Sequence, residues 1–206
     1  MKYGRTFNFS AGPAMDHAAL GRLLLDEAGT EELRRHRMAF LFGCVEPDRN
    51  FLTYLRGSLR HSPLRGHHAE NSQAYITRQL GRLERRGLGS AYRCFVLGTL
   101  LHYIADEFTY AHNAVFPGSL RDHVRYEHEM HPYFTAELER QRGIPWLPGS
   151  PDAILSDARA AYCANGHTMQ SDCRYIIRVC SVVLQKLAGA ACAPAVPRPR
   201  LCAGNL

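Results

Sequence analysis

Five side chains that commonly bind metal ions lie within one window of 26 residues: His102, Asp106, His112, His123 and Glu127. The first two are four residues apart, as are the last two, so each pair shares one face of a helix. A single histidine–carboxylate pair of this kind is often only a hydrogen-bonded pair in a core. Five such groups together are different, because each buried ionisable group is costly unless it is paired or binds a metal. Imidazole and carboxylate are zinc ligands, so the window predicts a buried centre with several zinc ions.

The segments that carry these residues have helical patterns. Apolar residues recur at spacings of three and four between Val96 and Phe108, which predicts a helix with one face toward a core. Residues 117–118, Pro-Gly, end this segment, and Ser119 is the expected N-cap of the next helix. We therefore predict two helices joined by a tight turn, packed as an antiparallel pair around the metal.

Before this window, we expect a helix from Asp16 to Ala28, with Asp16 as its N-cap and His17 in its first turn. A second helix is predicted from Glu31 to about Phe42, and Pro47 predicts a break that leaves Asp48 at a loop or helix start. The remaining pattern predicts a loop at residues 56–68, with His61, His67 and His68, and further helices at 71–85, 151–164 and 170–188. The helix that carries His123 and Glu127 is expected to continue beyond residue 127.

No convincing strand pattern occurs, so the predicted fold class is all-α, a multi-helix bundle with a buried zinc cluster. We expect one helical domain over residues 1–188. Residues 189–206 have the composition of a disordered tail.

The chain has 206 residues, of which 46% are hydrophobic, enough for one globular core. No stretch approaches the roughly 18 uninterrupted apolar residues of a membrane span. Residues 1–17 lack the apolar region of a secretory signal, so we expect either a cytoplasmic protein or a sequence given without its leader. Seven cysteines, an odd number without a C-x-x-C pair, argue against a disulfide framework and against a cysteine zinc site.

The net charge of +6 is compatible with an anionic partner, although basic residues on solvated helix faces explain it equally well. The eleven histidines are a clearer excess, and imidazole is the commonest protein ligand for zinc.

Four stretches resemble the zinc-dependent phospholipase C family, an all-α fold with a trinuclear zinc cluster. They are FLFGCVEPD (Phe40–Asp48), GHHAENS (Gly66–Ser72), LGTLLHYIADEFTYAHN (Leu97–Asn113) and HVRYE (His123–Glu127). Their order and approximate spacing follow the family from about His17 to Glu127. The H-x-x-x-D-x-x-x-x-x-H…H-x-x-x-E element is the specific part of the match.

The resemblance implies the zinc ligands residue by residue. One zinc would be held by Asp48, His67, His102 and Asp106, and a second by His112, His123 and Glu127. Asp106 would bridge to a third zinc, which His17 would also bind. The family completes this third site with the amino group and carbonyl of an N-terminal tryptophan, which this sequence lacks, so we expect two or three ions. The amine of Met1 is a conceivable substitute.

Other histidines are weaker candidates. His67 is preferred over His68 by the alignment of GHHAENS, and His61 is a further candidate ligand. His131, four residues after Glu127, is either a hydrogen-bond partner of that ligand or a surface residue.

The resemblance also implies the chemistry: a zinc-dependent phosphodiesterase in which metal-activated water attacks phosphorus and Asp48 acts as general base. Its substrate would be a glycerophospholipid or a related phosphodiester. Aromatic residues, whose alternative role is core packing, could line the cleft: Phe51, Tyr54, Tyr103 and Tyr110. Two alternatives remain open, a zinc nuclease acting on single-stranded nucleic acid and a non-catalytic helical protein stabilised by zinc.

Overall fold

A computed structural model describes residues 13–28, 30–50, 69–140, 147–165 and 167–192 of the chain. The α-helices are α1 (Pro13–Ala28), α2 (Glu31–Arg35), α3 (Arg37–Arg49), α4 (Ala69–Arg86), α5 (Ala91–Glu107), α6 (Leu120–Arg140), α7 (Pro151–Ala164) and α8 (Met169–Cys192), and a short 3₁₀-helix, η2, spans Tyr110–His112. No strand occurs among the described residues, so the predicted all-α class is confirmed. None of the described helices is long and apolar enough to cross a membrane.

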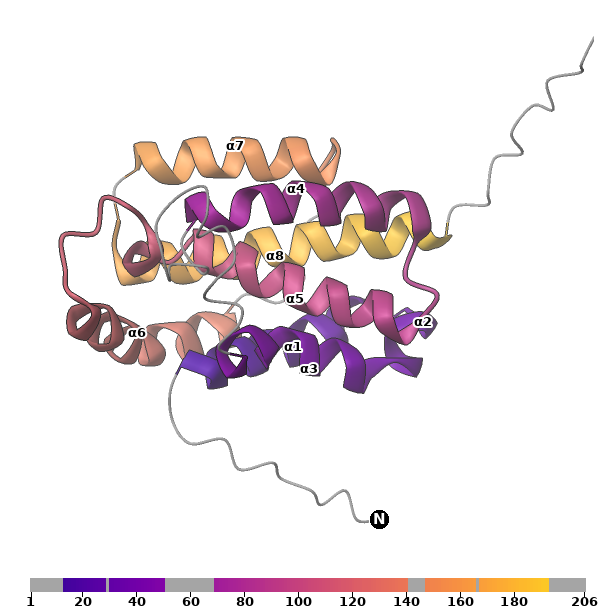
Figure 1. The fold of residues 1–206 in the computed structure, drawn as a ribbon, viewed down its shortest axis with the longest axis horizontal. Coiled ribbons are helices and arrows are strands. Elements are labelled where there is room, and N and C mark those ends of the chain that lie inside the picture. The colour runs from indigo at the N-terminus through magenta and orange to yellow at the C-terminus, as the bar shows by residue number, and fades with distance from the viewer. Residues whose placement is uncertain (1–12, 29, 51–68, 141–146, 166, 193–206) are drawn as a thin grey trace, which may run out of the picture.

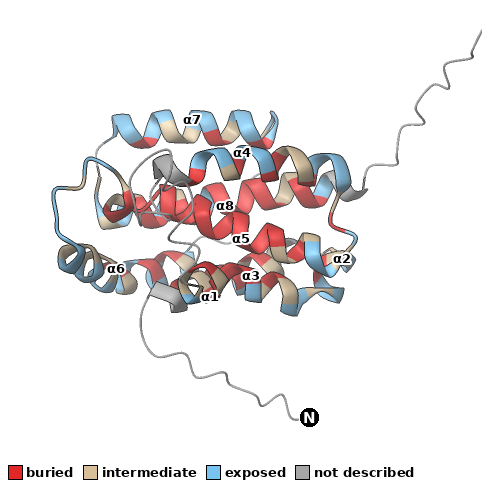
Figure 2. Ribbon diagram, viewed as in Figure 1, coloured by how far each residue is buried: buried red, intermediate tan, exposed pale blue. Residues whose placement is uncertain are grey.

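Helix α5 forms the centre of the bundle. Every residue from Val96 to Glu107 is buried, because α3, α4 and α8 all pack against this helix. In the view of Figure 1, α5 and α8 lie between α4 and α7 on one side and α1, α3 and α6 on the other. The buried residues in Figure 2 accordingly concentrate on α5 and α8. A polar side chain in this buried part of α5 is thus enclosed by protein.

The ends of several helices follow from local capping, as the sequence predicts. At the start of α6, the Ser119 hydroxyl accepts a hydrogen bond from the Asp122 backbone N–H (3.3 Å), and the Asp122 carboxylate accepts one from the Ser119 backbone N–H (2.9 Å). Ser150 caps α7 in a similar way, and Pro151 follows at the first helical position. Helices α4 and α7 match their predicted spans, and α8 extends to Cys192 instead of ending at Ala188.

The predicted break at Pro47 is wrong, since α3 continues through it to Arg49. The bond from the Asn50 N–H to the Glu46 carbonyl (3.0 Å) closes the turn beyond the proline, and Pro47 itself is buried. Packing against the bundle therefore outweighs the hydrogen bond that proline removes. Asp48 consequently lies in the last turn of a helix. The chain breaks earlier, at His36, which divides the predicted helix at 31–42 into α2 and the start of α3.

Helix α1 begins at Pro13, so the predicted N-cap role of Asp16 is also wrong. Proline suits the first helical position because its missing N–H would have no partner there. Asp16 lies within the first turn and is buried.

The predicted antiparallel pair is a third correction. Helix α6 packs on α8, α1 and η2 rather than along α5. The connection between α5 and α6 contains η2, which the sequence pattern did not reveal. The histidine–carboxylate pairs of α5 and α6 therefore meet near the connection, not along two paired helices.

Helices α3 and α5 approach each other more closely than side chains would allow. A Cβ atom on Gly43 would collide with the carbonyl oxygen of Phe95, and one on Gly98 would collide with the carbonyl oxygen of Phe40. Two glycines facing each other's helix backbone thus bring the two helices into direct contact. This contact sets Asp48 of α3 against His102 of α5.

Candidate metal centre

Seven of the eight predicted ligands lie in the described part of the chain, and the structure brings them together from five elements. They are His17 (α1), Asp48 (α3), His102 and Asp106 (α5), His112 (η2), and His123 and Glu127 (α6). The eighth, His67, lies outside the described residues, as do the alternatives His61 and His68.

The first ligand group consists of His17, Asp48 and His102, which offer atoms within 4.8 Å of one another. The His102 Nε2 atom lies 3.5 Å from Asp48 Oδ1 and 3.3 Å from Asp106 Oδ2. His17 Nε2 lies 3.3 Å from Asp106 Oδ1, and its ring stacks on that of His102 with centroids 3.9 Å apart. His17 therefore touches Asp106, as the resemblance implies. It also lies beside Asp48 and His102, which the resemblance assigns to a different zinc ion.

The second ligand group consists of His112, His123 and Glu127. One carboxylate oxygen, Glu127 Oε1, lies 3.0 Å from His112 Nε2 and 3.2 Å from His123 Nε2. His112 Nε2 is also 3.8 Å from Asp106 Oδ1, so Asp106 lies between the two groups. It is buried and contacts histidines from three different elements.

The donor set fits zinc. Two ligand atoms of a tetrahedral zinc, each about 2.0–2.2 Å from the ion, lie roughly 3.3–3.6 Å apart. The nitrogen–oxygen separations within the centre are 3.0–3.8 Å.

The orientation of His102 supports the same conclusion. Its Nδ1 lies 2.9 Å from the Cys44 carbonyl oxygen, which only accepts hydrogen bonds, so Nδ1 carries the proton. In neutral His102 the lone pair on Nε2 then points at the oxygens of Asp48 and Asp106. Such a contact is repulsive unless a proton or a metal ion lies between the atoms. A backbone carbonyl that fixes the tautomer of a histidine is a common feature of metal sites.

The charges of the centre are strongly coupled. Burial would raise the pKa of Asp106, but the nearby His102 and His112 hold it well below its usual range. Burial would likewise raise the pKa of Glu127, yet hydrogen bonds from His112 and His123 lower it to about 2. Burial lowers the pKa of His112, whereas Asp106 and Glu127 raise it to about 9. Positive charge is therefore favourable here, and a metal ion would supply it while displacing protons from the histidines.

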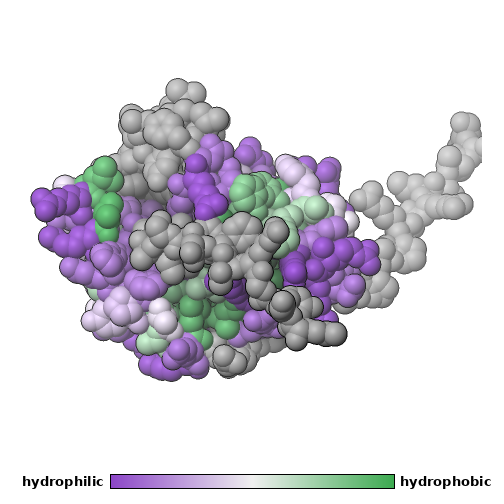
Figure 3. Space-filling view, turned by 90° about the horizontal axis from the view of Figure 1, so that it is seen from below, coloured by the Kyte–Doolittle hydropathy of each residue, from purple (hydrophilic) through white to green (hydrophobic). Residues whose placement is uncertain are grey.

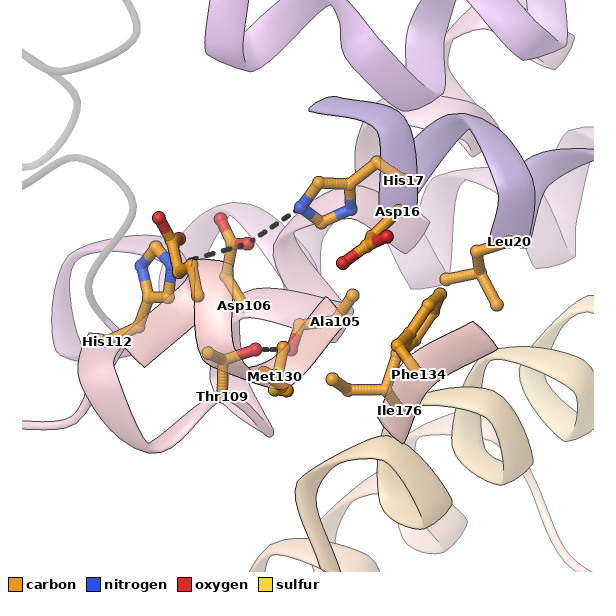
Figure 4. A pocket seen from close by; sticks show the side chains of 11 residues that line it. Asp16, His17, Leu20, Ala105, Asp106, Thr109, His112, Met130, Phe134 and Ile176 are labelled. Carbon is orange, nitrogen blue, oxygen red and sulfur yellow. Dashed lines mark hydrogen bonds and ion pairs between the residues drawn. The ribbon is translucent and has the colours of Figure 1, made fainter. Parts of the chain in front are cut away.

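A small cavity of about 20 Å³ borders the centre, with room for about one water molecule. Figure 4 shows that Asp106, His17 and His112 line one side of it. Leu20, Phe134 and Ile176 form part of an apolar wall on the other side. An apolar wall strengthens electrostatic interactions at the ligands, because it lowers the local dielectric constant.

Asp16 also lines this cavity and was not predicted to take part in the site. Its Oδ1 lies 2.5 Å from His131 Nδ1. His131 was expected either to bond to Glu127, one turn earlier on α6, or to lie at the surface. Its side chain is 42% exposed, and the structure pairs it across helices with Asp16 and not with Glu127. Only the contact of α1 with α6 could have revealed the pair.

Two other expectations concern side chains around the centre. Tyr103 is fully buried and packs edge-on against Tyr75, so of its two expected roles the structure shows core packing and not a place in a cleft. Tyr110 is half-buried in η2, while Phe51 and Tyr54 lie outside the described residues. No described cysteine belongs to either ligand group.

The comparison with protein families agrees with this geometry. The model of the family described as zinc dependent phospholipase C matches residues 16–181, which is most of the chain. The match extends the resemblance seen in the sequence from Glu127 into α8. No curated protein and no solved structure matches the chain.

Proposed function

The chain belongs to the zinc-dependent phospholipase C family, and on this premise we propose that it is a phospholipase C-like phosphodiester hydrolase. The observation that carries the proposal is the pair of ligand groups joined through Asp106. We propose that the two groups and the bridging carboxylate hold two or three zinc ions. Zinc bound there supplies a Lewis acid for the phosphodiester oxygens and lowers the pKa of a bound water toward 7.

The protein residues have separate tasks in this proposal. His17, His102, His112 and His123 present Nε2 atoms as neutral donors, and Asp106 and Glu127 supply negative charge. Asp48 is the candidate general base that takes a proton from the attacking water. Its side chain is 21% exposed, whereas those of His102 and Asp106 are 0% and 2% exposed, so Asp48 can meet a substrate phosphate and its water.

A lipid is the favoured substrate class because of the surface near α6. Seen from below, the described surface is mainly hydrophilic with separate hydrophobic patches (Figure 3). Val115, Leu120 and Val124 are 67%, 81% and 55% exposed, and they lie in and just before the first turns of the helix that carries His123. Exposed aliphatic side chains beside a site suit a substrate with acyl chains.

The second candidate is a nuclease for single-stranded nucleic acid. The observation in its favour is the net charge of +6, which would attract a polyanion. The same charge would also attract an anionic membrane surface, so it favours neither substrate by itself.

The test begins with zinc per chain in purified protein, followed by hydrolysis of phosphatidylcholine vesicles and of single-stranded DNA. We expect release of a phosphorylated head group, loss of activity in EDTA and recovery with added zinc. Asp48→Asn should abolish turnover, and its zinc content shows whether the loss comes from metal binding or from the base. Glu46→Gln is the matched control, because Glu46 lies on the same helix and bonds to Asn50 (2.6 Å).

Each other outcome assigns a different function. Turnover of DNA alone would establish the nuclease. Bound zinc without turnover of either substrate would establish a structural metal centre. Activity unchanged by EDTA would overturn the proposed mechanism.

A further inference from the structure

A fully buried carboxylate lies behind the metal centre. Asp172, in the first turn of α8, has 0% exposure and accepts three hydrogen bonds. Its Oδ2 accepts bonds from the Tyr110 backbone N–H and from the Tyr126 hydroxyl, both at 2.8 Å. Its Oδ1 accepts a bond from the Tyr162 hydroxyl at 2.7 Å. One side chain of α8 thereby joins η2, α6 and α7.

The two donors on Oδ2 come from the two elements that form the second ligand group. Tyr110 is two residues before His112, and both lie in the single turn of η2. Tyr126 directly precedes Glu127 and lies three residues after His123 on α6. One oxygen atom of Asp172 therefore fixes the position of η2 relative to α6. Neither donor belongs to a metal ligand, so Asp172 acts on the ligands only through the positions of η2 and α6.

The surrounding contacts make this connection rigid. The Tyr110 ring stacks on His167, with centroids 4.6 Å apart and planes inclined by 13°. Burial and the neighbouring Asp172 raise the pKa of the Tyr126 and Tyr162 hydroxyls, so both remain donors. Burial also raises the pKa of Asp172, and the three hydrogen bonds offset part of that rise.

We propose that Asp172 is a positioning residue for the second ligand group, holding His112 of η2 at the distance from His123 and Glu127 of α6 that zinc binding needs. Without the shared oxygen, η2 and α6 would still touch through the edge-on rings of Tyr110 and Tyr126, but no hydrogen bond to Asp172 would fix their separation. Zinc would then have to order the connection as it binds, and its affinity would fall. The inference concerns metal binding and goes beyond the proposed hydrolase activity.

The first test is a zinc titration of metal-free protein against a competing chelator. Asp172→Leu keeps about the size of the side chain and removes both acceptor oxygens, so the Tyr110 N–H and the Tyr126 O–H lose their shared acceptor. Asparagine would not have this effect, because its amide oxygen can take the place of Oδ2. Removing a group bonded directly to a metal ligand typically costs about 10- to 100-fold in metal affinity, and the bonds of Asp172 end on residues near the ligands, so we take the lower end of about 10-fold. We expect a loss of this size for one class of zinc site and an unchanged affinity for the rest.

A matched pair of tyrosine variants separates positioning from general stability. Tyr126→Phe and Tyr162→Phe each delete one hydroxyl bonded to Asp172, but only Tyr126 lies on an element that carries ligands. We expect Tyr126→Phe to weaken zinc binding about 10-fold and Tyr162→Phe to leave it near that of the wild type. This pair decides the question if Asp172→Leu does not fold.

The group affected is identified by combining Asp172→Leu with His123→Ala. If both act on the second group, the double variant binds zinc no more weakly than His123→Ala alone. Equal losses in the two tyrosine variants, unchanged zinc affinity in Asp172→Leu, or additive losses in the double variant would each overturn the inference. No substrate enters these measurements, so a wild type that binds zinc without hydrolysing any phosphodiester would end the proposed function and leave this test intact.

Discussion

We expect Gly98→Ala to destabilise the protein and to weaken its first ligand group. A Cβ atom on Gly98 would collide with the Phe40 carbonyl oxygen and would lie 2.8 Å from the Cys44 nitrogen and 3.0 Å from the Gly43 carbonyl carbon. All three are backbone atoms of α3, so no side chain can turn away and the two helices must separate.

The magnitude follows from two opposing terms. Overpacking a core costs about 1–3 kcal/mol, and contact with backbone atoms places Gly98 at the upper end. Alanine has a higher helix propensity than glycine, which offsets about 1 kcal/mol. We therefore expect the free energy of unfolding of metal-free protein to fall by about 2 kcal/mol.

The same separation of α3 and α5 also changes contacts in the metal centre. It lengthens the contact of His102 with the Cys44 carbonyl (2.9 Å) and with Asp48 (3.5 Å), both of which cross from α5 to α3. We expect weaker zinc binding in addition to lower stability. Urea unfolding of the metal-free protein measures the first effect, and a zinc titration measures the second.

Gly189→Ala is the matched control, since a Cβ atom on Gly189 of α8 would meet nothing within 4 Å. We expect it to raise the free energy of unfolding by about 0.5–1 kcal/mol through helix propensity alone. A Gly98→Ala protein as stable as the wild type would refute the close approach of α3 and α5. Lower stability with unchanged zinc affinity would refute the link between that approach and the metal centre.

Three further measurements test other parts of the structure. Arg159→Met should lower the free energy of unfolding by about 3–5 kcal/mol, because it leaves buried Glu107 without its bidentate partner (2.7 and 2.9 Å). Adding Glu107→Gln to this variant should restore most of the lost stability. Alkylation of native protein, followed by mass spectrometry, should label exposed Cys163 well before Cys44, because burial raises the pKa of the Cys44 thiol to about 12. Equal labelling of the two cysteines would show that Cys44 is accessible. Leu120→Asp should reduce hydrolysis of phospholipid vesicles several-fold and leave hydrolysis of a soluble short-chain substrate unchanged. If the variant and the wild type hydrolyse vesicles at the same rate, Leu120 has no role at a lipid surface.

The features that the sequence predicted well are encoded by neighbouring residues. The start of α6 depends on Ser119 and Asp122, and the start of α7 on Ser150 and Pro151, each within one turn. The long apolar pattern of α5 likewise identified the central helix. The all-α class follows from such local signals, because each helix can be recognised without knowing its partners.

The features that the sequence did not reveal depend on distant contacts. The continuation of α3 through Pro47 requires the packing of α3 on the bundle, which periodicity cannot express. The pair of Asp16 and His131 joins residues 115 positions apart. Asp172 was equally hidden, since its bonds to Tyr110 and Tyr126 span 62 and 46 positions. The resemblance to a family could bring the ligands together without showing which buried groups hold them.

The centre thus rests on two independent supports that meet at Asp106. The first group depends on direct contact between α3 and α5, and the second on the attachment of η2 and α6 to α8 through Asp172. These supports share no residue, so a change at Gly98 and a change at Asp172 should weaken different zinc sites and act additively. Asp106 contacts His17, His102 and His112, so a change at this residue alone should weaken both groups at once. A buried carboxylate at that junction is costly unless positive charge compensates it, and the histidines and metal ions of both groups would supply that charge.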